Sequence, residues 1–463
     1  MPESIPRILL AGLSGGTGKT IVSLALARAF SRAGRVVAPF KKGPDYIDAQ
    51  WLGLAAGRGC SNLDPFFHSR EIIRSVFYHK SAGADLSLVE GNRGLFDGMD
   101  ERGTCSSSEL ARMIDCPVIL AIDCTKMTRT VAAVVQGCAG FEPGLNLAGV
   151  ILNRTAGERH RSVLLRSMET YSDVPVLGML PKMGANPIPE RHMGLMSDQE
   201  YDGAGHLDRL ADLAEEWLDL DGIAAVADAA PNFGPAPAPV FPGPAAAKAA
   251  RIGYVHDAAL WFYYPENLEA LEHAGAELVR VSLLDGEPWP EVDGLYLGGG
   301  FPEVFAERIA ANRPALDYLR SRAEAGMPIY AECGGFMVLC DTLEVDGASH
   351  KMAGVFPLGT SFCPRPQGLG YTEAEVVEDS VFFPRGGRIL GHEFHYSMCV
   401  SDGAADLRHG LRMCRGQGSA LGRDGFLHRN TWAGYNHIHA LAVPGWASRF
   451  VAAAAAYGKG GGQ

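Results

Sequence analysis

Residues 7–30, RILLAGLSGGTGKTIVSLALARAF, restrict the fold of this chain more than any other stretch. An apolar run leads into a glycine-rich turn that ends in Gly-Lys-Thr, and an amphipathic helical pattern follows. Backbone N–H groups of such a turn can close around phosphate oxygens, and the helix N-terminus adds the positive end of its dipole. The stretch predicts an α/β nucleotide-binding domain in which Lys19 reaches the terminal phosphates and Thr20 binds Mg²⁺. The other predicted nucleotide-binding residues of the turn are Gly15, Gly16, Thr17 and Gly18.

The loop is a variant of the common G-x-x-x-x-G-K-[ST] pattern, because Leu13 stands where the first glycine is required. Partition-type ATPases use a similar frame with an additional lysine, and Ser14 occupies that position here. We therefore disfavour a switch that partitions DNA or membrane proteins. A flexible turn that contains Gly-Lys-Thr by chance is the structural alternative, and the placement between strand and helix argues against it.

Length and charge bound the remaining possibilities. A chain of 463 residues is longer than one hydrophobic core usually serves, so two or more domains are expected. The net charge of -12 argues against broad binding to nucleic acid or to an anionic membrane. The ten cysteines include no C-x-x-C pair, so neither a zinc site nor a disulfide framework is predicted. Without a signal-peptide pattern or an apolar run of about twenty residues, we expect a cytoplasmic protein.

A proline- and alanine-rich segment divides the chain. Residues 228–250 contain six prolines and predict a linker between an N-terminal domain, 1–227, and a C-terminal domain, 251–463. On both sides, apolar runs alternate with helical patterns, which predicts parallel sheets covered by helices. The predicted strands are 7–12, 36–40, 86–91, 117–123, 147–153 and 175–180 before the linker, and 251–256, 277–282, 293–300, 328–333, 388–397 and 432–440 after it.

Four acidic residues follow predicted strands of the first domain, namely Asp45, Asp48, Glu90 and Asp97. In an open α/β sheet these positions face the ligand crevice at the carboxyl edge. Mg²⁺ takes a few carboxylates together with phosphate and water oxygens. We predict Asp45 and Glu90 as metal ligands with Thr20. Each acid taken singly is more often a solvated loop residue, and the grouping at strand ends favours the functional interpretation.

Basic residues are interspersed with these acids. Lys41, Lys42 and Arg93 lie in the same loops and are candidates for receiving an anionic substrate or a transferring phosphoryl group. Lysines on a surface turn are usually only solvated. The functional interpretation of these residues therefore rests only on their position in the same loops as the acids.

The stretch YAECGGFMVL, residues 330–339, ends an apolar run on Cys333 and continues with two glycines and a helical pattern. A free cysteine is most often a small core residue. The alternative is a nucleophile held on a tight turn. The stretch alone favours the structural interpretation.

Six motifs together resemble the cobyrinic acid a,c-diamide synthase family, and they occur in the family's order over nearly the whole chain. They are FKKGPDYID, EGNRGLFDG, PERHMGL, LYLGGGFPE, AECGGF and GHEFHYS. The resemblance implies a P-loop ATP-binding domain similar to dethiobiotin synthetase, followed by a class I glutamine amidotransferase domain of the cobyric acid synthase type. It further implies amidation of the a and c acetate carboxylates of cobyrinic acid, with ATP, Mg²⁺ and L-glutamine, through an acyl phosphate.

The resemblance assigns the glutaminase residues. Cys333 matches the nucleophile, and oxyanion donors would come from Gly334 and from Gly299 or Gly300. His437 matches the partner histidine, with His439 as its rival. His439 stands where related H-x-E motifs carry the acid of the triad, so a Cys–His dyad is implied. For two further histidines, His392 and His395, we expect structural or substrate-contact roles.

Lys42 and Arg93, which lie in the same loops, are candidates for the substrate side, and the resemblance adds Tyr46, Asp48 and Asp97 to it. The resemblance also suggests that Asn153 contacts adenine, although asparagine after a strand is an ordinary turn residue as well.

The substrate itself stays open at this point. Asn92 and Arg93 depart from the usual family pattern, and Lys126 and Arg129 add charge to a loop that is usually less basic. Hydrogenobyrinic acid, nickel-sirohydrochlorin and sirohaem are therefore alternative tetrapyrrole substrates. A nucleotide-controlled binding protein with an inactive amidotransferase domain, or a plain cysteine hydrolase, would explain fewer of the motifs. A homodimer is compatible with the sequence.

Overall fold

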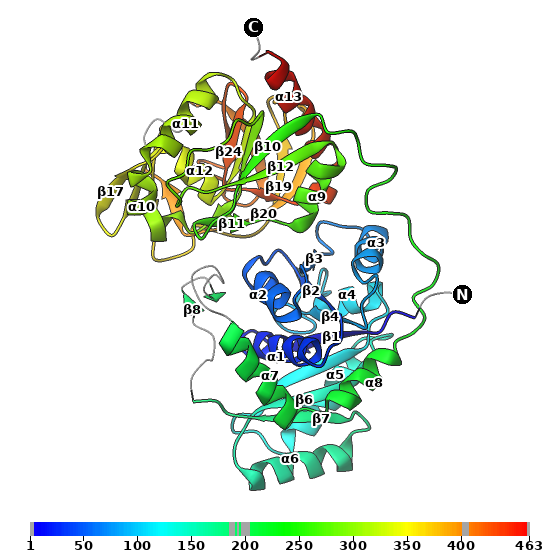
Figure 1. The fold of residues 1–463 in the computed structure, drawn as a ribbon. Helices are drawn as coiled ribbons and strands as arrows, with labels where there is room; N and C mark the ends of the chain where they lie inside the picture. The colour runs from blue at the N-terminus through cyan, green and yellow to red at the C-terminus, as the bar shows by residue number, and fades with distance from the viewer. Residues whose placement is uncertain (1–3, 185–189, 192–193, 196–203, 401–406, 461–463) are drawn as a thin grey trace. The chain divides into compact units, whose positions relative to one another are not determined.

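The apolar runs of the first half form a seven-stranded parallel sheet in the computed structural model (Figure 1). The strands, in spatial order, are β3 (Ser61–Leu63), β2 (Val37–Lys42), β4 (Leu86–Glu90), β1 (Arg7–Gly12), β5 (Val118–Asp123), β6 (Leu147–Thr155) and β7 (Val176–Pro181). Every residue of β1, β2 and β4 is buried, which explains why these strands are continuous apolar runs in the sequence. Since β2, β4 and β1 are neighbours, the loops after them meet at one edge of the sheet.

The structure describes residues 4–184, 190–191, 194–195, 204–400 and 407–460. They fall into two units, residues 1–242 and 243–463, which we call the N-terminal and C-terminal units. No helix of the described residues is long and apolar enough to cross a bilayer.

Helices flank the first sheet (Figure 1). They are α1 (Lys19–Arg32), α2 (Ile47–Ala56), α3 (Arg70–Lys80), α4 (Ser107–Met113), α5 (Thr130–Phe141), α6 (Glu158–Tyr171), α7 (Ala204–Trp217) and α8 (Leu220–Asp228). Within the PERHMGL motif, β8 (Glu190–Arg191) pairs with β9 (Gly194–Leu195). The other residues of that motif lie outside the described residues.

The C-terminal unit contains a ten-stranded sheet that is mixed, so the expectation of a parallel sheet was wrong for this half. Five strands run parallel, in the order β12 (Ala276–Val281), β10 (Ala250–Val255), β13 (Gly294–Leu297), β15 (Ile329–Glu332) and β24 (Thr431–Gly434). Antiparallel strands extend them through β23 (Arg423–His428), β22 (His409–Arg415), β19 (Gly368–Val376), β20 (Arg388–His395) and β25 (His437–Ile438). Polar residues interrupt the apolar pattern of β19 and β22, because one face of an antiparallel sheet can meet water. They include the half-buried Glu373 and Glu375 of β19 and the exposed Arg412 and Arg415 of β22.

Smaller elements complete this unit. A four-stranded sheet joins β17 (Ala348–Lys351), β16 (Cys340–Val345), β18 (Phe356–Phe362) and β21 (Ser397–Cys399), and β11 (Leu260–Phe262) pairs with β14 (Gly299–Gly300). The helical segments are α9 (Pro265–His273), η1 (Pro302–Phe305), α10 (Ala306–Ala311), α11 (Arg313–Glu324), α12 (Gly334–Leu339), η3 (Ala440–Ala442) and α13 (Trp446–Gly460). All six residues of α12 are buried, so its first turn lies in the apolar core.

The segment between α8 and β10 is extended, and its first part packs on the N-terminal unit. The carbonyl of Pro231 accepts a hydrogen bond from Arg7 (2.7 Å), and the carbonyl of Ala238 accepts one from Ser75 (2.6 Å). The Phe233 ring is 1% exposed and lies 4.0 Å from the guanidinium of Arg74. Residues up to Ala238 therefore belong to the packing of the N-terminal unit.

Candidate functional site

The phosphate loop lies between β1 and α1, as the sequence predicts. Gly18 is the residue before α1 and has a φ of 91°, and a Cβ at this position would lie 2.3 Å from Nδ2 of Asn153. That amide donates a hydrogen bond to the carbonyl oxygen of Thr17 (2.8 Å). Only glycine suits position 18, because both the dihedral angle and the close approach exclude a side chain. Asn153 thus holds the loop backbone, and its predicted adenine contact stays a prediction.

Lys19 lies over the same loop. Its ammonium donates to the carbonyl oxygen of Ser14 (3.0 Å), and burial lowers the pKa of Lys19, although Glu90 opposes this effect. The ammonium therefore sits at the loop that is expected to bind phosphate.

Three predicted acids converge on the ammonium of Lys41, and Thr20 contacts two of them. Its Nζ lies 2.7 Å from Asp48, 2.7 Å from Glu90 and 3.6 Å from Asp45. The Thr20 hydroxyl donates to Glu90 (2.8 Å) and lies 3.3 Å from Asp48. The structure thus brings together Thr20, Asp45, Asp48 and Glu90. Lys41, which the sequence offered as a candidate for receiving an anionic substrate or a phosphoryl group, is paired with the three acids.

Burial and charge oppose each other in this cluster. Burial raises the pKa of Asp45 to about 7, and the neighbouring Asp48 adds to this effect. Burial also raises the pKa of Glu90. Burial would likewise raise the pKa of Asp48, but the charge of Lys41 and hydrogen bonds with Lys41, Asp45 and Thr20 together outweigh burial, so the pKa is lowered. For Lys41, burial acts to lower the pKa and the carboxylates raise it well above its ordinary value, so the ammonium stays charged.

The donor set fits a magnesium ion. A hydroxyl and carboxylate oxygens are the ligands that Mg²⁺ prefers, usually one or two carboxylates with phosphate and water. Oε2 of the fully buried Glu90 has no hydrogen-bond partner among the described residues, which leaves an acceptor for a cation. Among the described residues, no group of three or more His, Cys, Asp or Glu side chains is arranged to hold a metal ion by itself.

Of the predicted substrate residues, Asp48 belongs to the acid cluster, and the other four lie on the strands and loops that carry it. Lys42 is 5% exposed, and burial lowers its pKa. Arg93 has a φ of 53°, and Asp97 accepts a hydrogen bond from the Gly94 N–H (2.9 Å) within the same loop. Tyr46 is the residue before α2. Their substrate roles stay predictions.

In the C-terminal unit, Cys333 lies on a sharp turn between β15 and α12. Its φ of 48° and ψ of -103° lie outside the regions that non-glycine residues normally occupy. A Cβ on Gly334 would lie 2.8 Å from Leu260, and one on Gly335 would lie 2.5 Å from the carbonyl oxygen of Leu297. The two glycines therefore permit the turn. Strained backbone at a strand-to-helix turn is typical of nucleophile elbows.

The thiol is protonated at rest. Cys333 is 4% exposed, and burial raises its pKa far above the ordinary value, with a further contribution from the charge of Glu303. The N–H of Gly334 acts in the opposite direction, as an oxyanion donor would. A thiol in this state needs a base at the moment of attack.

His437 lies beside the glycine loop. A Cβ on Gly299 would lie 2.5 Å from Cε1 of His437, so a glycine makes room for the imidazole. Nδ1 of His437 lies 3.6 Å from Oε2 of Glu332, and the His392 ring stacks on His437 at 4.7 Å. The second predicted oxyanion glycine, Gly300, pairs with Leu260.

The rival histidine faces a different acid. Nε2 of His439 lies 3.5 Å from Oε2 of Glu266, and its ring lies 4.7 Å from Tyr264. His395 stacks on Tyr435 at 3.7 Å, which fits the expected structural role.

The sequence interpretation missed Glu332, because this residue lies within an apolar strand. An acidic residue inside such an apolar run was the signal that could have identified it.

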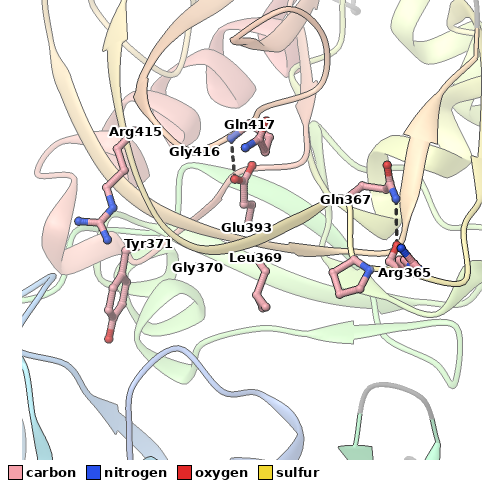
Figure 2. A pocket seen from close by; sticks show the side chains of 10 residues that line it. Arg365, Gln367, Leu369, Gly370, Tyr371, Glu393, Arg415, Gly416 and Gln417 are labelled. Carbon is pink, nitrogen blue, oxygen red and sulfur yellow. Dashed lines mark hydrogen bonds between the residues drawn. The ribbon is translucent and has the colours of Figure 1, made fainter. Parts of the chain in front are cut away.

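A polar cavity of about 620 Å³ opens beside β19 and β20 (Figure 2). Glu393 lies within it and accepts hydrogen bonds from the N–H groups of Gln417 (2.7 Å) and Gly418 (2.9 Å). The other lining residues are Arg365, Pro366, Gln367, Leu369, Gly370, Tyr371, Arg415, Gly416 and Gln417. The sequence interpretation did not identify this cavity.

The phosphate loop with its acid cluster, and the strained cysteine turn in a unit that also holds the buried His437, define a class of enzyme. In this class a nucleotide-binding domain is joined to a glutamine amidotransferase domain. Two family models match the corresponding parts of the chain. Residues 8–195 match a CobQ/CobB/MinD/ParA nucleotide binding domain, and residues 251–444 match a CobB/CobQ-like glutamine amidotransferase domain.

Full-length relatives specify the family. Cobyrinate a,c-diamide synthase of Magnetococcus marinus is 43% identical over 96% of this chain and 97% of its own length. Its counterpart in Listeria innocua is 38% identical over 95% and 97%, and the one in Archaeoglobus fulgidus is 38% identical over 97% and 98%. The chain belongs to the cobyrinate a,c-diamide synthase family, which confirms the resemblance carried by the motifs.

Proposed function

We propose that this enzyme amidates the a and c acetate carboxylates of cobyrinic acid, with ammonia from L-glutamine and activation by ATP. The observation that carries the proposal is the strained turn at Cys333, which occurs in the same chain as the acid cluster beside the phosphate loop. We choose cobyrinic acid as the substrate because the full-length relatives are named cobyrinate a,c-diamide synthase. The acidic chain supports a reaction in the cytoplasm, without nucleic acid or membrane as a partner.

The activation step belongs to the N-terminal unit. Backbone groups of the loop and Lys19 bind the phosphates, while Thr20, Asp45 and Glu90 would hold Mg²⁺, which neutralises phosphate charge when bound. A substrate carboxylate oxygen attacks the terminal phosphorus of ATP, and ADP leaves. Ammonia then attacks the carbonyl carbon of the acyl phosphate, phosphate leaves, and one proton is lost.

The nitrogen comes from the C-terminal unit. His437 takes the proton of Cys333, and the thiolate attacks the amide carbon of glutamine. The N–H of Gly334 and one from Gly299 or Gly300 bind the oxyanion. The imidazolium returns the proton to the leaving ammonia, and water hydrolyses the thioester to glutamate.

Mass spectrometry of the product tests the proposal. The full chain, incubated with ATP, Mg²⁺, glutamine and cobyrinic acid, is expected to give a diamide. Cys333→Ala should lose glutamine-dependent amidation and keep ammonia-dependent amidation, whereas Glu90→Gln should lose both. Hydrogenobyrinic acid, nickel-sirohydrochlorin and sirohaem are the parallel substrates, and a change in none of the four would contradict the proposal in favour of a nucleotide-controlled binding protein.

One departure from the family pattern has a structural role. The guanidinium of Arg129 lies 4.6 Å over the ring of Tyr171, so its positive charge has a cation–π partner within the N-terminal unit. This contact weakens the hypothesis that Arg129 recognises additional carboxylates of the substrate.

A further inference from the structure

Glu332 is the last residue of β15 and directly precedes the cysteine of the elbow. Its side chain is fully buried. Oε1 accepts hydrogen bonds from the hydroxyl of Tyr330 (3.1 Å) and from the N–H of Ile438 (3.1 Å). Oε2 accepts one from the hydroxyl of Tyr296 (3.1 Å) and lies 3.6 Å from Nδ1 of His437.

These contacts explain why the residue is an acid. All three hydrogen-bond partners are donors, and burial raises the pKa of both Tyr296 and Tyr330 well above the ordinary value, so their hydroxyls stay protonated. An ionised carboxylate only accepts, which matches such surroundings. A buried charge is costly unless it is paired, and the Nδ1 of His437 is the group at Oε2 that can carry a positive charge.

We propose that Glu332 positions His437 for glutamine hydrolysis, an inference that rests on the function proposed above. The negative charge of the carboxylate, 3.6 Å from Nδ1, favours the tautomer with the proton on Nδ1 and leaves Nε2 as the basic nitrogen. It also stabilises the imidazolium that forms when the Cys333 thiol is deprotonated. The acid is thus supplied by the residue before the nucleophile, while His439 occupies the usual position of the acid.

The chain offers a matched control. Glu266 is equally buried and lies 3.5 Å from Nε2 of His439. Both pairs join a buried glutamate to a buried histidine in the same unit. Only the pair of Glu332 and His437 includes the histidine beside Gly299.

The test compares Glu332→Gln with Glu266→Gln in the full chain. Glu332→Gln is expected to lower the kcat for glutamine hydrolysis about 100-fold or more, because loss of the positioning acid of a triad has effects of this size or larger. The KM for glutamine and the ammonia-dependent amidation rate should change less than about threefold, since neither depends on the histidine tautomer. Glu266→Gln should keep the wild-type kcat, and Glu332→Asp should restore part of the lost rate.

Two results would overturn the inference. One is a kcat of Glu332→Gln within about threefold of wild type. The other is an equal fall of the glutamine- and ammonia-dependent rates in that variant, which would show a purely structural role. Hydrolysis of glutamine by the wild type under the same conditions separates this failure from failure of the proposed function.

Discussion

At the scale of single residues, the glycines of the phosphate loop differ in what they contribute, as Gly18 and Gly15 show. Gly18 combines a φ of 91° with a virtual Cβ only 2.3 Å from the Asn153 amide, whereas a Cβ on Gly15 would meet nothing within 4 Å. Two glycines of the same motif therefore serve different purposes, and only one is required by the fold of the loop.

We predict that Gly18→Ala weakens ATP binding at least tenfold and destabilises the N-terminal unit by about 2 kcal/mol, because the substitution strains the backbone and displaces Asn153. Gly15→Ala should change stability by less than about 0.5 kcal/mol. Titration calorimetry with ATP and thermal unfolding measure the two effects. Equal stability of the two variants would contradict the prediction.

The pairing of charged side chains was the least predictable feature of the two sites. The sequence identified Thr20, Asp45 and Glu90, since each follows a strand or a glycine loop. It did not identify the pairing of Lys41 with these acids or that of Glu332 with His437, because sequence spacing does not show which charges face each other across neighbouring strands. Those contacts depend on the order of strands in the sheet.

At the scale of elements, the turn between β15 and α12 stores strain at Cys333. Cys340, at the other end of the same helix, is equally buried and has an ordinary φ of -69°. The two cysteines thus allow a comparison between a strained and a relaxed position within one element.

At position 333 a glycine variant should be more stable than an alanine variant, and at position 340 it should be less stable. We expect Cys333→Gly to be more stable than Cys333→Ala by about 1 kcal/mol, since glycine removes the strain of a positive φ. Cys340→Gly should be less stable than Cys340→Ala by about 0.5–1 kcal/mol, because glycine is the more flexible residue when unfolded. Urea unfolding of the four variants gives the values, and the same order at both positions would refute the stored strain.

Elements also differ in how well the sequence predicts them. The parallel strands were predictable, because strands buried on both faces are continuous apolar runs. The three-residue β3 was too short for a pattern, and strands such as β19 and β22 carry half-buried or exposed polar residues that blur the alternation. The mixed sheet of the C-terminal unit was missed for this reason.

At the scale of the whole molecule, the proline-rich segment has two different parts. Residues from Pro231 to Ala238 contact Arg7, Arg74 and Ser75 of the N-terminal unit, and Phe233 stacks on Phe77 at 5.5 Å. Composition alone predicts a linker from residue 228, because prolines obscure the packing of the residues between them.

A fragment of residues 1–242 should therefore be more stable than one of residues 1–227. We expect a difference of about 3 kcal/mol, since the shorter fragment loses a buried phenylalanine and leaves the buried Arg7 without one hydrogen bond. Thermal unfolding of the two fragments tests this. Identical melting temperatures would show that the segment contributes nothing to the first unit.

The ammonium of Lys41 supplies its three acids with a counter-charge that cannot diffuse away. Because Lys41 belongs to the chain itself, the three acids keep this positive neighbour whether or not another cation is bound. The lysine thereby limits the repulsion between their negative charges.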